Sequence, residues 1–142
     1  MKIVVVDDSG VQRKMIINII RKAGFDNEIL EADTGKTAIQ IVGMNFKDIG
    51  LILCDWNMPV MNGYEFIAGM AKVPQVAGIP IVMVTTEGTE AKIEQAYAVH
   101  PNLAGYIIKP FTPDQLRAKI EPILKLAQAD TPPAPTPPPP QA

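Results

Sequence analysis

Four short apolar runs, each followed at once by a chemically reactive residue, constrain the fold of this chain most. The runs span residues 4–6, 51–54, 81–84 and 106–108, and the residues that follow them are Asp7 with Asp8, Asp55, Thr85 and Lys109. Runs of this length and β-branched content predict strands buried on both faces of a parallel sheet. The carboxyl ends of parallel strands share one edge, where open α/β folds bind their ligands. We therefore expect three carboxylates, a hydroxyl and an ammonium group to converge there.

Strand-like and helix-like segments alternate from residue 1 to about residue 128, without internal repeats. We expect strands near 2–6, 28–32, 51–54, 80–85 and 104–108, and helices near 10–23, 35–45, 63–72, 89–99 and 113–127. Helix starts have recognisable signals: Ser9 with Gln12 has capping-box spacing, and Thr112 precedes a proline and a glutamine. The pattern predicts one α/β domain of the (βα)5 type over residues 1–128.

Several side chains have an expected environment. The first helix should lie on the sheet through a stripe made of Val11, Met15, Ile19 and Ala23, with basic residues such as Arg13 facing water or a partner. Trp56 is expected to be a partly exposed loop aromatic, and His100, which precedes a proline, a surface residue.

Charge and composition exclude several classes of function. The 142 residues include 13 basic and 15 acidic side chains, a balance that argues against binding to nucleic acid or to an anionic membrane. Cys54 is the only cysteine, so an internal disulfide is impossible. The start of the chain does not resemble a signal peptide, and no run is long enough to span a membrane. We expect a cytoplasmic monomer.

The composition changes abruptly near the carboxyl terminus. Residues 130–142 contain seven of the 14 prolines in the chain. Such a segment lacks backbone donors and has little to bury, so we expect residues 129–142 to be a disordered, extended tail. The alternative is a ligand for a proline-recognising partner.

The converging residues favour phosphoryl chemistry. Asp7, Asp8 and Asp55 would repel one another unless a cation lay among them, and hard oxygen ligands favour Mg²⁺. Lys109 adds a second positive charge for a phosphate group. Asp55 is then the natural nucleophile, forming an acyl phosphate, and Thr85 is placed to donate a hydrogen bond to a phosphoryl oxygen.

These residues together resemble the receiver domain of bacterial response regulators, over residues 1 to about 127. The resemblance rests on the paired acidic residues Asp7 and Asp8, the segment 55–63, the segment 85–87 and the segment 109–111. It is closest to the stand-alone chemotaxis members of that family. The family implies a flavodoxin-like, doubly wound parallel sheet with strand order 2-1-3-4-5.

The resemblance also implies roles for individual residues. Asp55 would accept a phosphoryl group from a sensor histidine kinase or a histidine phosphotransfer domain. Asp8, Asp55 and the backbone carbonyl of Asn57 would bind Mg²⁺, with Asp7 acting through water. Lys109 would hold the phosphoryl group. The chain would be a phosphoacceptor that assists its own phosphorylation and dephosphorylation, not an enzyme.

Family members further imply a switch. Thr85 would move toward the phosphoryl group and Tyr106 would change from an exposed to a buried rotamer. Asn57 and Glu87 would tune the hydrolysis of the acyl phosphate, and the Lys109–Pro110 bond resembles a family cis peptide. The chemotaxis members imply a flagellar motor switch protein and a phosphatase as further partners.

Other readings of the same pocket stay open. A receiver of a phosphorelay, or one without a role in motility, would keep the same acidic residues. A hydrolase of the haloacid dehalogenase type would need a second aspartate where Asn57 stands. A flavodoxin-like protein that binds FMN would need a Ser-, Thr- and Gly-rich loop in place of Asp7 and Asp8, which would repel the nucleotide phosphate.

Overall fold

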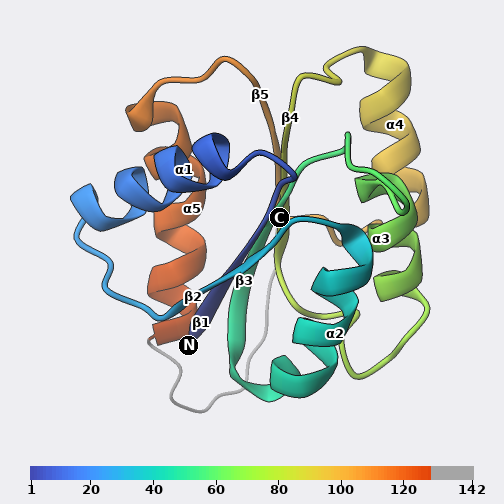
Figure 1. Cartoon of the computed structure of the whole chain (residues 1–142), viewed down its shortest axis with the longest axis horizontal. Coiled ribbons are helices and arrows are strands. Elements are labelled where there is room, and N and C mark those ends of the chain that lie inside the picture. The colour runs from blue at the N-terminus through green and yellow to red at the C-terminus, as the bar shows by residue number, and fades with distance from the viewer. Residues whose placement is uncertain (129–142) are drawn as a thin grey trace.

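Five strands form one parallel sheet in the order β2-β1-β3-β4-β5, in a computed structural model that describes residues 1–128 (Figure 1). The strands are β1 (Lys2–Val6), β2 (Ile29–Ala32), β3 (Ile49–Cys54), β4 (Ile81–Thr85) and β5 (Gly105–Ile108). The helices are α1 (Gly10–Lys22), α2 (Gly35–Asn45), α3 (Gly63–Ala71), α4 (Glu90–Val99) and α5 (Pro113–Gln128), with a short 3-10 helix at Phe46–Asp48. The predicted (βα)5 fold and its strand order are confirmed.

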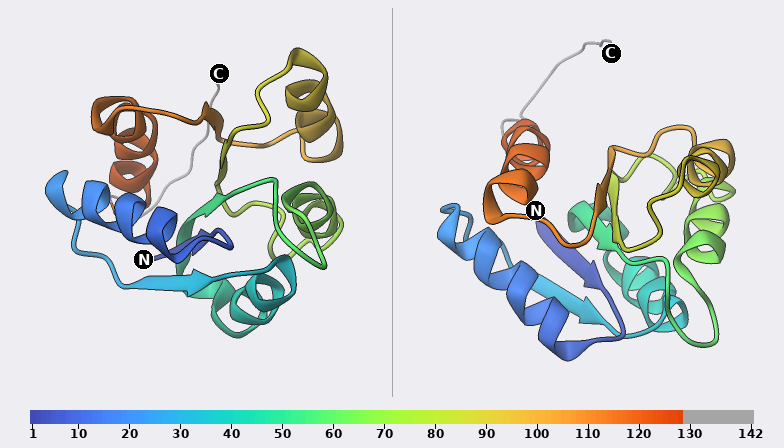
Figure 2. Two further views of the ribbon diagram at one scale, coloured as in Figure 1. Left: turned by 45° about the horizontal axis from the view of Figure 1, so that its top comes forward. Right: turned by 90° about the horizontal axis from the view of Figure 1, so that it is seen from above.

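Helices cover both faces of the sheet and create two apolar cores (Figure 2). Successive residues of a strand point to opposite faces, so each strand supplies both cores. Ile3 and Val5 of β1 pack with α1 and α5, whereas Val4 and Val6 pack with α2, α3 and α4. β3 is buried at every position, as expected for the middle strand of such a sheet.

The helix starts use the expected caps. Ser9 accepts a hydrogen bond from the backbone N–H of Gln12 at 3.2 Å. Thr112 and Gln115 cap each other, with bonds of 3.1 Å and 2.8 Å. A further capping box, between Asn62 and Glu65 at the start of α3, was not anticipated. Each cap satisfies backbone donors that a helix leaves free in its first turn.

The apolar stripe predicted for α1 is wrong in its amino-terminal half. Val11 is 77% exposed and Met15 is 40% exposed, whereas Ile16 and Ile20 are buried beside Ile19. The helix is rotated so that its isoleucines, which are larger than Ala23, pack in the same apolar core as Ile3 and Val5 of β1. An isoleucine-rich helix buries more apolar area in this orientation.

His100 is buried, contrary to the surface position predicted for it. Its backbone carbonyl accepts a hydrogen bond from the Leu103 N–H at 3.1 Å, which makes a turn after α4, and the residue is 1% exposed. Neither ring nitrogen has a hydrogen-bond partner within the described residues. Burial accordingly lowers the pKa of His100.

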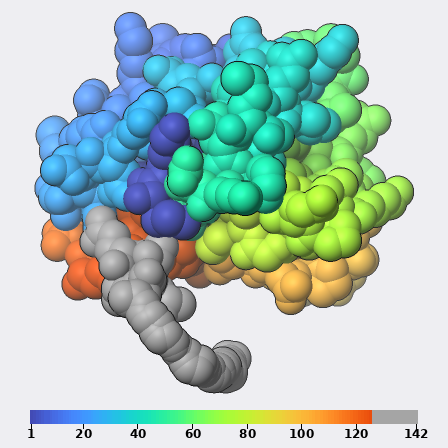
Figure 3. Space-filling model, turned by 90° about the horizontal axis from the view of Figure 1, so that it is seen from below, coloured from blue at the N-terminus to red at the C-terminus, as the bar shows by residue number. Residues whose placement is uncertain are grey.

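The start of the chain lies at the amino ends of the parallel strands, the edge opposite the reactive residues. Its dark blue atoms are at the surface in the view from below (Figure 3). The Asn27 side chain donates to the backbone oxygen of Met1 at 2.7 Å, and the Lys2 ammonium donates to Asn45 at 3.1 Å. These bonds connect β1 to the loop before β2 and to the end of α2.

Among residues 1–128, no helix is both long enough and apolar enough to cross a bilayer. The proline-rich segment, for which we predicted an extended tail, lies outside the described residues.

Candidate functional site

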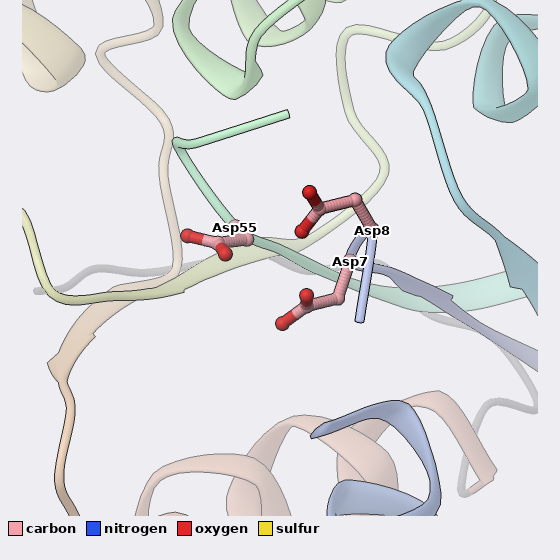
Figure 4. Close-up of side chains that lie close together, drawn as sticks. All are labelled: Asp7, Asp8 and Asp55. Atoms are coloured by element: carbon pink, nitrogen blue, oxygen red, sulfur yellow. The ribbon is translucent and has the colours of Figure 1, made fainter. Parts of the chain in front are cut away.

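Three carboxylates meet at the carboxyl end of the sheet. Asp7, Asp8 and Asp55 each offer an oxygen within 4.8 Å of the other two. The side chains of Asp7 and Asp8 extend from the end of β1 toward Asp55 at the end of β3 (Figure 4). Asp7 and Asp55 are 1% and 7% exposed, while Asp8 is open to solvent. The convergence follows from the register of β1 and β3, in which Val6 lies opposite Cys54.

Backbone bonds of the sheet continue into the site and fix these residues. The N–H of Asp55 donates to the Val6 carbonyl at 2.9 Å, and the N–H of Asp7 donates to Ala32 at 3.0 Å. One Asp7 carboxylate oxygen also accepts from the N–H of Ser9 at 2.9 Å. Asp7 is therefore held by its backbone and its side chain.

Lys109 reaches the same site from the end of β5. Its ammonium lies 2.8 Å from Asp7 Oδ2 and 3.4 Å from Asp55 Oδ2. The Lys109–Pro110 peptide bond is cis, and the N–H of Lys109 donates to the Thr85 carbonyl at 2.8 Å. The ammonium thus lies between two buried carboxylates.

Charge balance indicates what this site can hold. Three ionised carboxylates against one ammonium leave two excess negative charges in a small volume. All-oxygen donors are the ligands of hard divalent cations such as Mg²⁺, and a doubly charged ion would cancel the excess. A hollow of about 460 Å³ opens beside Asp8 and is lined by Asp8, Trp56, Asn57, Met58, Pro59 and Asn62. The residues present therefore fit a divalent cation with open positions facing solvent.

A second group of polar contacts joins the ends of β3, β4 and β5 through Glu87. The Asn57 amide donates to the Glu87 carboxylate at 3.0 Å and to the Thr86 hydroxyl at 3.4 Å. The Glu87 N–H donates to the buried Thr85 hydroxyl at 3.2 Å. Tyr106 donates its hydroxyl to the Glu87 carbonyl. Direct contacts therefore connect the four residues to which the resemblance gave a switching or hydrolysis-tuning role: Asn57, Thr85, Glu87 and Tyr106.

Tyr106 is half-buried, and its hydroxyl is bonded to the Glu87 carbonyl. Burial, followed by the negative charges of Glu87 and Asp55, raises the pKa of Tyr106 to about 12. The phenol is therefore a hydrogen-bond donor at neutral pH.

Cys54 lies just before Asp55, and burial raises the pKa of its thiol well above the usual value.

Trp56 is buried, which corrects the prediction of a partly exposed aromatic. It is 6% exposed, its ring stacks on Tyr64 with centroids 5.4 Å apart, and the Lys92 ammonium lies 4.8 Å from its ring centre. Gly63 makes this possible, because a Cβ there would lie 2.1 Å from the backbone oxygen of Asp55. The glycine lets α3 begin directly against the end of β3, and Tyr64 then covers the indole.

Arg13 was expected to face water or a partner, but it contacts the site. Its guanidinium donates to the Asp7 backbone carbonyl at 2.6 Å and to Glu31 at 2.8 Å. Glu31 lies on β2, 18 positions away, so local sequence patterns give no signal for the pair.

Comparisons with known proteins agree with this geometry. The family model of the response regulator receiver domain matches residues 3–121. A chemotaxis protein CheY homolog of Campylobacter jejuni is 40% identical over 124 residues, which cover 87% of this chain and 92% of the relative. The chemotaxis protein CheY1 of Helicobacter pylori is 39% identical over 87% of this chain and 97% of its own length.

A solved structure is similar as well. The chemotaxis response regulator CheY4 of Vibrio cholerae aligns with a TM-score of 0.75 at 32% identity, over 86% of this chain and 97% of that protein. The family match covers most of the chain, and the relatives exceed 30% identity across nearly their whole length. The chain belongs to the response regulator receiver domain family and is homologous to CheY chemotaxis regulators.

Proposed function

We propose that Asp55 accepts a phosphoryl group in a Mg²⁺-dependent reaction, with a sensor histidine kinase or a histidine phosphotransfer domain as the donor. Receiver domains are phosphoacceptors, and this chain has the oxygen donors and the ammonium that such chemistry requires. The observation that carries the proposal is the approach of Asp7, Asp8 and Asp55 to within 4.8 Å, with Lys109 against two of them.

In this proposal Asp8, Asp55 and the backbone carbonyl of Asn57 hold the ion, and Asp7 acts through water. When bound, Mg²⁺ neutralises charge on the phosphoryl oxygens. Asp55 attacks the phosphorus atom, an O–P bond forms, the N–P bond of the donor breaks, and the donor imidazole takes up a proton. The Lys109 ammonium, already 3.4 Å from Asp55 Oδ2, pairs with the transferred group. The phosphoryl transfer then depends mainly on the positioning of the reacting groups and on stabilisation of the charge in the transition state.

Thr85, Glu87 and Tyr106 form the proposed switch. The Thr85 hydroxyl binds the backbone of Glu87, whose carbonyl accepts from Tyr106. A phosphoryl group on Asp55 would compete for the Thr85 hydroxyl and thereby move the loop to which Tyr106 is bonded. Asn57 and Glu87, which meet beside Asp55, are the residues proposed to tune hydrolysis. Such a switch can respond only through contacts that differ between the two states.

The named relatives are chemotaxis proteins, which supports a role for this chain in chemotaxis signalling in the cytoplasm. Its output partners would be a flagellar motor switch protein and a phosphatase, reached through protein contacts.

The alternative function, a hydrolase of the haloacid dehalogenase type, is disfavoured, because the Asn57 amide donates to Glu87 and has no acidic proton to give to a leaving group. We propose that the receiver domain ends near residue 128.

The test is incubation with acetyl phosphate and Mg²⁺, followed by intact mass spectrometry. We expect one phosphoryl group per chain, no labelling when Mg²⁺ is chelated, and none in Asp55→Asn. Labelling that persists in Asp55→Asn, or that is independent of Mg²⁺, would contradict the proposal.

A further inference from the structure

The Arg13 side chain connects α1 to the backbone that carries two of the acidic residues. Its Nη1 donates to the Asp7 carbonyl oxygen at 2.6 Å, and its Nε donates to Glu31 Oε1 at 2.8 Å. The side chain is only 19% exposed. Both bonds involve one planar guanidinium, whose donors have fixed relative directions, so the two partners together determine its orientation.

The bonded carbonyl belongs to the peptide that joins Asp7 to Asp8. A peptide unit is planar, so fixing this oxygen also fixes the N–H and the Cα of Asp8, the atoms from which its side chain starts. The peptide before Asp7 is restrained as well, because the N–H of Asp7 donates to the Ala32 carbonyl at 3.0 Å. The turn between β1 and α1 is therefore restrained before and after Asp7.

Asp8 depends on this restraint more than its neighbours do. The carboxylates of Asp7 and Asp55 each contact the Lys109 ammonium. For Asp8, which is exposed, the described part of the chain offers no hydrogen bond or ion pair to its carboxylate. Its approach to the other two acidic groups thus follows from the path of the backbone.

Glu31 keeps the guanidinium turned toward that backbone. Without this ion pair, only the bond to the Asp7 carbonyl would orient the guanidinium. Partners of this kind, which orient the groups that bind a metal, commonly affect metal affinity by tenfold or more.

We infer that Arg13, held in place by Glu31, is a positioning residue for the divalent-cation site. It fixes the Asp7–Asp8 peptide so that the Asp8 carboxylate projects toward Asp55. This inference rests on the proposed function, because it concerns the same ion.

Charge and positioning predict opposite effects, which makes the inference testable. Arg13 is a cation near three carboxylates, so its removal should tighten the binding of a divalent cation if charge alone mattered. If Arg13 positions Asp8, its removal should weaken binding. The sign of the change therefore distinguishes a positioning residue from a nearby surface charge.

The experiment is calorimetric titration of the full chain with Mg²⁺, alongside urea unfolding of each variant. We expect Arg13→Met to bind Mg²⁺ about tenfold more weakly, Arg13→Lys to recover part of the loss, and Glu31→Gln to show a smaller loss. The matched control is Arg21→Met. Arg21 lies on the same helix and also donates to a backbone carbonyl, that of Phe25 at 3.0 Å, but away from the acidic residues. Its substitution should leave Mg²⁺ affinity unchanged.

Unchanged or tighter binding in Arg13→Met overturns the inference while leaving the proposed function intact, provided the unsubstituted chain binds Mg²⁺. If the unsubstituted chain shows no saturable binding, the proposed function fails and the inference fails with it. If Arg13→Met does not fold, Arg13→Lys decides, because it keeps the charge and changes the geometry: it must bind Mg²⁺ more weakly, and wild-type affinity overturns the inference.

Discussion

Tyr106 donates its hydroxyl to the backbone carbonyl of Glu87, which ties β5 to the loop that follows β4. The same Glu87 receives the Asn57 amide through its side chain at 3.0 Å. One residue therefore links the loop beside the proposed phosphoacceptor to the tyrosine of the proposed switch. The proposed switch would act through this short chain of direct contacts.

Removing the Tyr106 hydroxyl should weaken the fold without preventing phosphorylation. Tyr106→Phe keeps the ring but leaves the Glu87 carbonyl without this donor, which should cost about 1 kcal/mol of unfolding free energy. Urea unfolding measures the loss, and acetyl phosphate labelling should be retained. Tyr97→Phe, at another partly buried tyrosine, is the control and should change stability less. Equal effects of the two substitutions would mean that the bond to Glu87 contributes nothing.

The Asn57–Glu87 hydrogen bond should influence the lifetime of the acyl phosphate. Asn57 lies beside Asp55, because its backbone N–H donates to Asp55 Oδ1 at 3.3 Å, and its side chain is exposed; Asn57→Ala should therefore open a path for water to the phosphoryl group. We expect hydrolysis to be about threefold faster, which corresponds to an activation barrier lower by about 0.7 kcal/mol. Following the loss of labelled chain after the donor is removed measures this rate. A slower rate in Asn57→Ala would contradict the role given to the amide.

Gly63 and Gly69 lie on the same helix but should respond oppositely to alanine. A Cβ at Gly63 would meet the Asp55 carbonyl oxygen at 2.1 Å, whereas a Cβ at Gly69 would meet nothing within 4 Å. We expect Gly63→Ala to destabilise the chain by about 3 kcal/mol and Gly69→Ala to stabilise it by about 0.5–1 kcal/mol. Urea unfolding distinguishes them, and a tolerated Gly63→Ala would show that α3 does not depend on this close approach.

The buried His100 should make stability depend on pH. Burial lowers its pKa from the usual 6.5, so the unfolded chain binds the proton more tightly than the folded chain. The contribution of the neutral imidazole is complete above about pH 6.5 and decreases as the pH falls below that value. His100 is the only histidine, so His100→Leu removes this dependence.

Unfolding at about pH 7.5 and about pH 5.5 tests this expectation. The original chain should lose more stability between these values than His100→Leu does. An identical loss in both would mean that carboxylates alone account for the pH dependence.

The fold was predictable because its signals are local. Each apolar run predicts a strand, and each cap, such as Ser9 or Thr112, predicts the start of a helix. Strand-like and helix-like segments alternate along the chain, and this order is compatible with few topologies. The convergence of Asp7, Asp8 and Asp55 was predictable for the same reason, since each follows a strand of one parallel sheet.

What the sequence did not reveal depends on how distant segments cover one another. Trp56 is buried because Tyr64 lies over it, and the exposure of Val11 depends on how α1 is rotated on the sheet. The Arg13–Glu31 pair joins a helix and a strand that are adjacent only after folding. Such contacts between distant segments leave no local pattern in the sequence.

The central claim is that the acidic cluster prepares Asp55, and no other residue, for phosphorylation. It is tested most directly by treating the chain with acetyl phosphate and Mg²⁺, reducing the acyl phosphate with borohydride, and locating the product by peptide mass spectrometry. Reduction converts a phosphorylated aspartate to homoserine, which marks the position permanently. We predict homoserine at residue 55 alone, and only when Mg²⁺ is present. Homoserine at position 7 or 8, or an unmodified chain, would contradict the claim.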